Sequence, residues 1–152
     1  MSVTFAVESF DKVRMDIQPL LVEHYREVAL YQESVLLAPD WERYERASAA
    51  GMLAVFTARK DTQLIGYSVF ILTTLLHYQH TTSATNDILF LSKEHRKGLT
   101  GFKLIKFSEA ELRKLKVQRI LWHVKTDHDF RAMLHRLGYV DEEIVVGKLI
   151  KD

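Results

Sequence analysis

The chain has 152 residues, of which 47% are hydrophobic and 27% charged, as in an ordinary globular protein, and we expect residues 1–152 to form one domain. Its 21 Lys and Arg residues nearly balance 20 Asp and Glu residues, so no overall charge favours nucleic acid or a membrane surface. There is no cysteine, which excludes disulfides, a thiolate nucleophile and cysteine-ligated zinc. Early acidic residues argue against a signal peptide, and the longest apolar run is too short to span a bilayer. We therefore expect a cytoplasmic protein with no membrane partner.

The first third of the chain predicts one strand and two helices. Residues 3–10 are typical of a short edge strand, and residues 11–32 carry apolar side chains at helical spacing. Pro19 lies within that helical pattern and marks either the true helix start or a kink. Residues 40–51 predict a second helix, opened by Asp40 as its N-cap and closed by Gly51.

The remaining sequence predicts a sheet with further helices. Three β-rich runs cover residues 52–59, 63–78 and 83–93, and they are followed in chain order by an amphipathic helix over 101–116, a strand over 117–125, a short helix over 127–138 and a last strand over 142–151. The apolar side of the 101–116 helix is formed by Leu104, Ile105, Ser108, Leu112 and Leu115. This order indicates a single α/β or α+β domain with a mixed sheet, in which residues 86–124 form a right-handed parallel crossover.

The stretch EHRKGLTGFKLIKF, residues 94–107, joins the third of those strands to the amphipathic helix. Free N–H groups and a partial positive charge at a helix N-terminus favour anions, and glycines let the backbone approach a phosphate. The stretch contains neither a P-loop nor a G-x-G-x-x-G sequence. What remains is Arg96-Lys97-Gly98-Leu99-Thr100-Gly101, which is either a phosphate-binding loop or an ordinary strand-to-helix turn.

These residues resemble motif A of the GCN5-related N-acetyltransferase (GNAT) superfamily, R/Q-x-x-G-x-G/A. Arg96 and Gly101 fall on its first and last positions, Leu99 stands in place of its first glycine beside Gly98, and Lys93 replaces a common proline. The predicted order of elements and the stretch FRAMLHRLGY are also similar to this family. The details look most like small acetyltransferase-like proteins of tailed bacteriophages.

The resemblance implies a GNAT fold that binds acetyl-coenzyme A and no metal. It implies that splayed central strands receive the pantetheine arm on the main chain of Leu89, Phe90 and Leu91, and that region 127–130, with Asp127 and Phe130, contacts the pantetheine end. The phosphates would be held by Arg96, Lys97, Gly98, Leu99, Thr100 and Gly101. Lys97 and Lys103 would screen phosphate charge, or are simply solvated surface lysines.

For the base that deprotonates an amine acceptor, Asp87 is our first candidate. Regular strand alternation would place Asp87 on the same face as Leu89 and Leu91. The alternative is an Asn86-Asp87 turn that starts the strand. His24 and Glu27 are the next candidates, because they lie three residues apart on one helix face. A hydrogen-bonded core histidine is the alternative for His24.

The family's usual proton-donating tyrosine corresponds here to Leu134, which cannot donate a proton. Tyr139 and His135 are nearby in sequence but displaced from that position. Tyr139 remains a candidate, although the signature aromatic position that it matches normally packs in the core. His77 and Tyr78, at the end of a long strand, either recognise the acceptor or cap the sheet edge. The spacing of His77 and His80 suits a helix rather than a strand, so we expect no metal site.

Three functions remain open from the sequence. The first is an N-acetyltransferase that acts on an unidentified amine, and the second is a non-catalytic phage protein that keeps the fold for binding or structure. The third is nucleic-acid binding, with a variant that acylates a modified DNA base. The basic residues available for the third are Lys93, His95, Arg96, Lys97, Lys103 and Lys106. Residues 142–151 could also pair across a homodimer.

Overall fold

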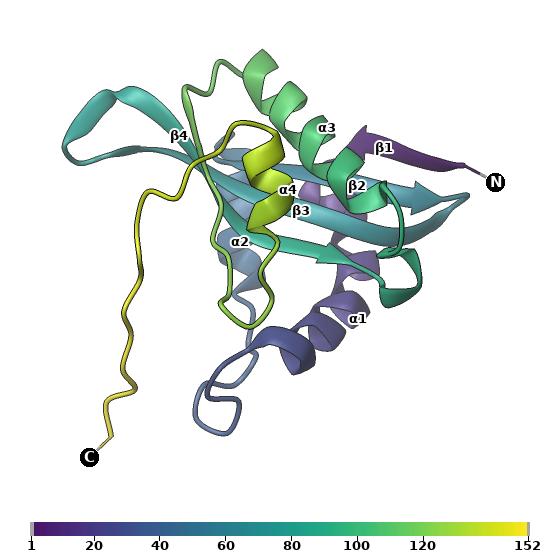
Figure 1. Ribbon diagram of the computed structural model, residues 1–152, viewed down its shortest axis with the longest axis horizontal. Helices are drawn as coiled ribbons and strands as arrows, with labels where there is room; N and C mark the ends of the chain where they lie inside the picture. Colours follow the sequence, from purple (N-terminus) through teal and green to yellow (C-terminus); the bar gives the residue numbers. More distant parts are fainter. Residues whose placement is uncertain (1, 152) are drawn as a thin grey trace.

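The computed structural model describes residues 2–151, and its centre is a five-stranded mixed sheet (Figure 1). The strands lie in the order of the chain: β1 (Val3–Val7), β2 (Leu53–Lys60), β3 (Gln63–Leu75), β4 (Tyr78–Leu91) and β5 (Arg119–Leu121). The first four pair antiparallel, whereas β4 and β5 are parallel. The predicted mixed α/β architecture and the parallel passage from β4 to β5 are therefore confirmed.

Helices cover both faces of this sheet. They are α1 (Phe10–Val28), α2 (Trp41–Ala49), α3 (Thr100–Lys114) and α4 (Arg131–Arg136), with a 3₁₀ turn η1 at Lys93–His95. On one face, Phe10 and Ile17 of α1 pack against Tyr67 and other buried side chains of the sheet. On the other face, Leu104 and Leu112 of α3 pack against a second apolar cluster. Burial of one such side chain stabilises the fold by about 1.5–3 kcal/mol.

The signals at the ends of α2 act as predicted. The side chain of Asp40 accepts a hydrogen bond from the Arg43 N–H at 3.0 Å, which satisfies one free donor of the first turn. Gly51 follows the helix with φ +71°, a left-handed conformation that glycine adopts without a Cβ clash. Pro19, in contrast, lies inside α1, which already begins at Phe10.

The sheet splays between β4 and β5. β4 pairs with β3 as far as Leu91, opposite Gly66, but it pairs with β5 only through residues 83–85. Among the described residues, no strand accompanies residues 86–91 on the β5 side. The β4 edge between Asn86 and Leu91 is thus open beside the loop that enters α3.

Three sequence predictions are wrong in detail. The strand predicted over 117–125 is reduced to Arg119–Leu121, because the chain diverges from β4 after that point. Leu115 is 55% exposed rather than part of the buried side of α3, because the helix ends at Lys114. Residues 142–151 form no strand: the segment is extended, exposed and without a neighbouring strand (Figure 1).

Candidate active site

The loop before α3 presents a run of unused main-chain donors. Arg96 N–H donates to Lys93 O and Lys103 N–H donates to Leu99 O, but within the described structure the N–H groups of residues 97–102 have no protein acceptor. The N-cap position of α3 is Leu99, whose side chain cannot supply a capping bond. The N-terminus of this 15-residue helix therefore carries free donors and a partial positive charge, which together favour an anion.

The two glycines of this loop have different roles. Gly98 has φ +95°, a left-handed conformation that is costly for Leu, whereas Leu99 has an ordinary φ of −105°. The backbone conformation that favours glycine thus occurs at position 98, one residue before the position expected for the motif's first glycine. At Gly101, a Cβ would meet only Leu91 Cδ2, at an ordinary contact distance of 3.6 Å. The protein itself does not require glycine at position 101.

Arg96 ties the loop to α1 and to β4. Its guanidinium donates two hydrogen bonds of 2.6 Å to the carboxylate of Glu27, and its Nε donates to Leu91 O at 2.7 Å. The Glu27 side chain is only 13% exposed. The hydrogen bonds from Arg96 lower the pKa of Glu27, so its carboxylate is ionised at neutral pH. Glu27 is thereby suited to hold the loop in place rather than to accept a proton.

Asp87 does not share a face with Leu89 and Leu91. The pairing of β3 and β4 shifts at this point, because Val69 is opposite Ile88 and Phe70 is opposite Asn86, so Asp87 is the extra residue of a β-bulge. The buried Asn86 side chain stabilises the bulge by donating to Val69 O and Ile88 O. The bulge interrupts the regular alternation and turns Asp87 toward the face that α1 and α2 cover.

On that face Asp87 lies near two tyrosines, Tyr44 and Tyr67, that were not among the predicted site residues. The Tyr44 hydroxyl, from α2, donates to Asp87 Oδ2 at 2.5 Å. Burial, and then the hydrogen bond to Asp87, raises the pKa of Tyr44. The Tyr67 hydroxyl is fully buried and has no hydrogen-bond partner, and burial followed by the charge of Asp87 raises the pKa of Tyr67. Asp87 is itself exposed and remains open to an incoming group.

His24 lies close to the open edge of β4. Its ring centroid is 5.6 Å from that of Phe90, and the Arg96 guanidinium carbon is 5.9 Å from the centroid of the same Phe90 ring. Burial lowers the pKa of His24, as do the charges of Arg96 and His128, while Glu27 opposes this shift. The imidazole of His24 is therefore neutral at pH 7 and can accept a proton.

The remaining candidates lie elsewhere. Tyr139 packs 6.3 Å from Trp122 beside the α3 cluster, on the face of the sheet opposite Asp87, and burial raises the pKa of Tyr139 to about 12. Leu134 is buried. His77 and Tyr78 are at the exposed β3–β4 hairpin, where Tyr78 begins β4 rather than ending β3. Nine residues of strand place Tyr78 about 30 Å from Asp87.

Region 127–130 forms the turn into α4. Asp127 is exposed and accepts a hydrogen bond from Thr126, and the half-buried Phe130 lies 6.2 Å from Trp122. Asp129 accepts a hydrogen bond from the Arg131 N–H at 3.0 Å, and Arg131 lowers the pKa of Asp129 to about 2. The side chains of Lys97, in the candidate phosphate-binding loop, and Lys103, in the first turn of α3, are exposed.

The functional residues that were not predicted have only weak local signals in the sequence. Tyr44 lies three residues after Trp41, a spacing that predicts one aromatic side of α2. In the structure both rings pack on Phe10. Nothing local indicates that Tyr44 reaches Asp87, 43 residues later. Within residues 2–151, no helix is long and apolar enough to cross a membrane, and no cluster of three or more His, Asp or Glu is placed to hold a metal ion.

Sequence comparison finds no matching family model and no matching curated protein. Solved structures, however, share the fold. An aminoglycoside acetyltransferase from an uncultured soil metagenomic sample matches with a TM-score of 0.74 and 15% identity over 100% of both chains. A ribosomal-protein-alanine N-acetyltransferase from Brucella melitensis biovar Abortus 2308 matches with a TM-score of 0.70 and 14% identity, over 99% of this chain and 100% of that chain.

A protein described as a predicted acetyltransferase from Clostridium acetobutylicum, solved with acetyl-CoA, matches with a TM-score of 0.70 and 9% identity, over 97% of this chain and 96% of that chain. At these identities the likeness establishes the fold. The chain has the mixed α/β fold of GNAT acetyltransferases, as its sequence predicted.

Proposed function

We propose that this protein is an N-acetyltransferase that transfers an acetyl group from acetyl-coenzyme A to an amine. The observation that carries the proposal is the run of unused N–H groups over residues 97–102, at an uncapped helix N-terminus directly beside the open edge of β4. A diphosphate is an anion that such donors bind well. Lys97 and Lys103, both exposed near these donors, add positive charge without contacting a carboxylate in the described structure.

The open edge of β4 would receive the pantetheine arm. Its main-chain groups between Asn86 and Phe90 have no strand beside them on the β5 side, so an extended arm with amide groups can pair there as a strand would. Leu91 O already accepts a hydrogen bond from Arg96, so we expect the pantetheine arm to bond only with the main chain of residues 86–90. Arg96 thus acts on the loop's position, through Glu27 and Leu91, rather than on the phosphates.

The reaction would be direct attack on the thioester. The amine nitrogen forms a bond to the acetyl carbonyl carbon, the C–S bond breaks, and the electron pair leaves with sulfur as the coenzyme A thiolate. The proton lost by the amine passes to Asp87, and the hydrogen bond from Tyr44 holds that carboxylate in position. His24 is the second candidate base, because its imidazole is neutral at pH 7. Because Leu134 replaces the usual acid, we expect the thiolate to leave without a protein proton donor.

The acceptor would be a primary amine that arrives as an ammonium ion. It would lose one proton to water before its nitrogen attacks, and the second proton, lost on attack, is the one that passes to Asp87. Asp87 offers a negative charge to such a group, and the phenol rings of Tyr44 and Tyr67 and the indole of Trp41 lie on the same face of the sheet. The hairpin residues His77 and Tyr78 are about 30 Å away along β4, so we propose no contact between them and a small acceptor.

The absence of an acid at Leu134 favours a second candidate, a non-catalytic protein that binds acetyl-coenzyme A. The nucleic-acid alternative is weaker, because the charge of Arg96 is compensated by Glu27. Acylation of a modified DNA base would use the same site with a larger acceptor. We propose a cytoplasmic location, in a host cell if the chain is phage-encoded, because acetyl-coenzyme A is present there for the binding and acylation functions.

Calorimetry with acetyl-coenzyme A, followed by thiol release across a panel of amines, tests the proposal. The chain has no cysteine, so a thiol-reactive dye reports only released coenzyme A. We expect binding, followed by amine-dependent release. Binding without release would support the non-catalytic candidate, and no binding would overturn both.

A matched pair of variants locates the phosphates. Gly101→Glu places a carboxylate at the donor run and should abolish binding, while the fold stays intact because position 101 has room. Ala110→Glu adds the same side chain at an exposed position later in α3 and should bind as the unmodified protein does. Equal binding by both variants would place the phosphates elsewhere.

A further inference from the structure

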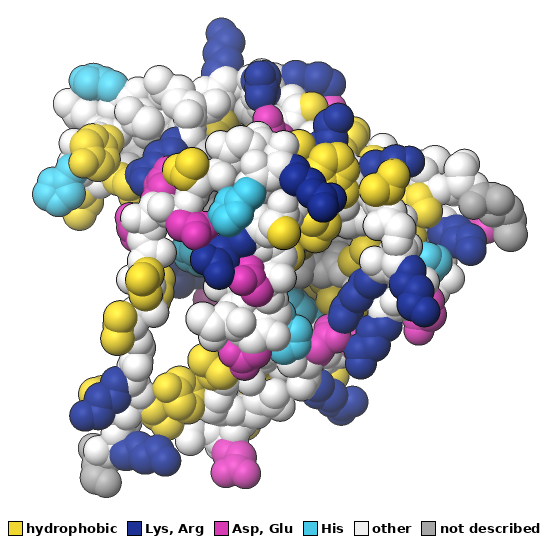
Figure 2. Space-filling model, in the orientation of Figure 1, with side chains coloured by type: hydrophobic (Ala, Val, Ile, Leu, Met, Phe, Trp, Pro, Cys, Tyr) yellow, Lys and Arg dark blue, Asp and Glu magenta, His cyan; other side chains and the backbone are white. Residues whose placement is uncertain are grey.

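The segment 143–151 has the composition of a strand but pairs with no strand in the described part of the chain. Ile144, Val145, Val146 and Ile150 are 91%, 85%, 91% and 80% exposed, although β-branched residues favour sheets. Figure 2 shows hydrophobic side chains along this segment, which stands clear of the body of the molecule. In an extended chain Ile144 and Val146 point to one side while Val145 and Leu149 point to the other. Apolar residues on both sides are typical of a strand covered on both faces.

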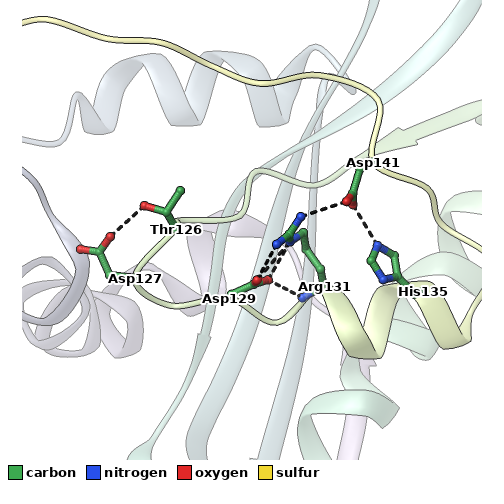
Figure 3. A network of polar contacts seen from close by, with 6 residues as sticks. All are labelled: Thr126, Asp127, Asp129, Arg131, His135 and Asp141. Carbon is green, nitrogen blue, oxygen red and sulfur yellow. Dashed lines mark hydrogen bonds and ion pairs between the residues drawn. The ribbon is translucent and has the colours of Figure 1, made fainter.

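The point at which this segment leaves the fold is fixed by ion pairs. Asp141 accepts from Arg131 and interacts with His135 Nε2, both at 2.9 Å, and Figure 3 shows how these side chains of α4 converge on it. Arg131 is held in turn by Asp129, at 2.8 Å. Glu142 accepts from Arg119, the first residue of β5, at 2.5 Å. The segment therefore begins beside β5 and then runs away from the chain's own sheet (Figure 1).

The same chain has a sheet edge without a partner. β5 pairs with β4 on one side, and among the described residues no strand pairs with its other side. All three residues of β5 are only half-buried. Next to this edge lies a surface hollow between α3 and the turn after α4. Its lining combines the apolar side chains of Val117, Ile120 and Leu137 with the polar or charged side chains of Glu109, Arg113 and Gln118. An open edge beside a hollow that is partly lined by apolar side chains is a surface that an extended segment with apolar residues can cover.

We propose that two copies of this chain form a dimer by reciprocal exchange of residues 143–151, each segment adding a strand to the open β5 edge of the other copy. A second copy is the occupant because one chain carries both an extended apolar segment without a neighbour and a sheet edge without a partner, so a two-fold exchange satisfies both at once. The nine residues span about 30 Å when extended, which is enough to cross to a neighbouring sheet. The ion pairs at Asp141 and Glu142 fix the direction in which each segment leaves its own copy.

Light scattering over protein concentrations from about 1 to about 500 μM tests the dimer. We expect a mass of about 35 kDa, twice the chain mass of 17.7 kDa. Ile144→Lys with Val146→Lys should halve this mass without lowering the melting temperature of the monomer, because both side chains are exposed in the single chain. Leu30→Lys with Leu36→Lys, which charges two exposed residues in the loop after α1, is the matched control and should remain dimeric. A monomer at all concentrations, or a dimer that survives the first pair of changes, would overturn the proposal.

Cross-linking tests the exchange itself. Because the chain has no cysteine, Leu121→Cys on a tagged copy and Val145→Cys on an untagged copy, expressed together, provide one thiol each. A short bismaleimide should join tagged to untagged chains, which requires the segment of one copy to lie beside β5 of the other. A dimer that yields no mixed product would show that the copies meet through another surface, and it would equally overturn the proposal.

Discussion

The Glu27 carboxylate accepts two 2.6 Å hydrogen bonds from the Arg96 guanidinium, and this contact joins α1 to the loop that precedes α3 across 69 positions of sequence. A two-pronged contact between a carboxylate and a guanidinium fixes orientation as well as distance. The contact holds Arg96 in a position from which Arg96 Nε also donates to the carbonyl oxygen of Leu91, the last residue of β4. The shape of the donor loop therefore depends on a residue of the first helix.

Glu27→Gln should weaken acetyl-coenzyme A binding rather than the chemical step. The amide cannot accept both hydrogen bonds, so Arg96 and the loop lose their fixed geometry. We expect the KM for acetyl-coenzyme A to rise about tenfold and stability to fall by about 1 kcal/mol, with kcat nearly unchanged. Steady-state thiol release measures KM and kcat, and thermal melting measures the stability. Glu23→Gln, one turn earlier on the exposed side of α1, is the control, and a loss of kcat alone in Glu27→Gln would instead support a role as base.

The same ion pair predicts how stability depends on pH. Arg96 lowers the folded-state pKa of Glu27 below its ordinary value of 4.5, so the unfolded chain binds the proton more tightly. The contribution of Glu27 to stability is complete above about pH 4.5 and is lost as the pH falls through the folded-state pKa. Melting temperatures of the unmodified protein and of Glu27→Gln should therefore differ by a constant amount from pH 7 to pH 5 and converge at lower pH. A difference that grows in acid would contradict this assignment.

Asp87→Asn should lower kcat about 100-fold while leaving acetyl-coenzyme A affinity unchanged, because an amide cannot accept the amine proton. Tyr44→Phe removes the hydroxyl that positions Asp87 and should lower kcat by a smaller factor, about tenfold, since the base remains. Thiol release under saturating substrates measures both effects. Full activity in Asp87→Asn together with inactivity in His24→Asn would transfer the role of base to His24.

The sequence predicted the elements better than it predicted their contacts. Period-two patterns, the Asp40 cap and Gly51 are local signals, and the structure contains the first four strands and the ends of α2 that they indicate. The orientation of Asp87 depends instead on where the pairing with β3 shifts, which is a property of two strands. Regular alternation therefore placed Asp87 on the wrong face.

Contacts between residues that are distant in sequence could not be predicted either, because they also depend on how two elements pack together. Nothing near Glu27 indicates Arg96, and nothing near Tyr44 indicates Asp87, because packing of the helices on the sheet brings each pair together. The prediction of a last strand was wrong for a different reason. Residues 142–151 have the composition of a strand, but a strand needs a neighbour, and the single chain provides none for them.

The neighbouring residues Gly98 and Leu99 provide a final prediction, because only one of them is under conformational constraint. A Cβ at Gly98 has free space, but φ +95° makes any other residue strained, so Gly98→Ala should cost about 1–2 kcal/mol and shift the donor N–H groups. Leu99→Ala removes a 63% exposed side chain at an ordinary φ and should change neither stability nor affinity by more than a small factor. Thermal melting and calorimetry with acetyl-coenzyme A measure the two effects. If Leu99→Ala lost binding while Gly98→Ala kept it, the Leu99 side chain, and not the backbone turn at Gly98, would be the feature that the ligand requires.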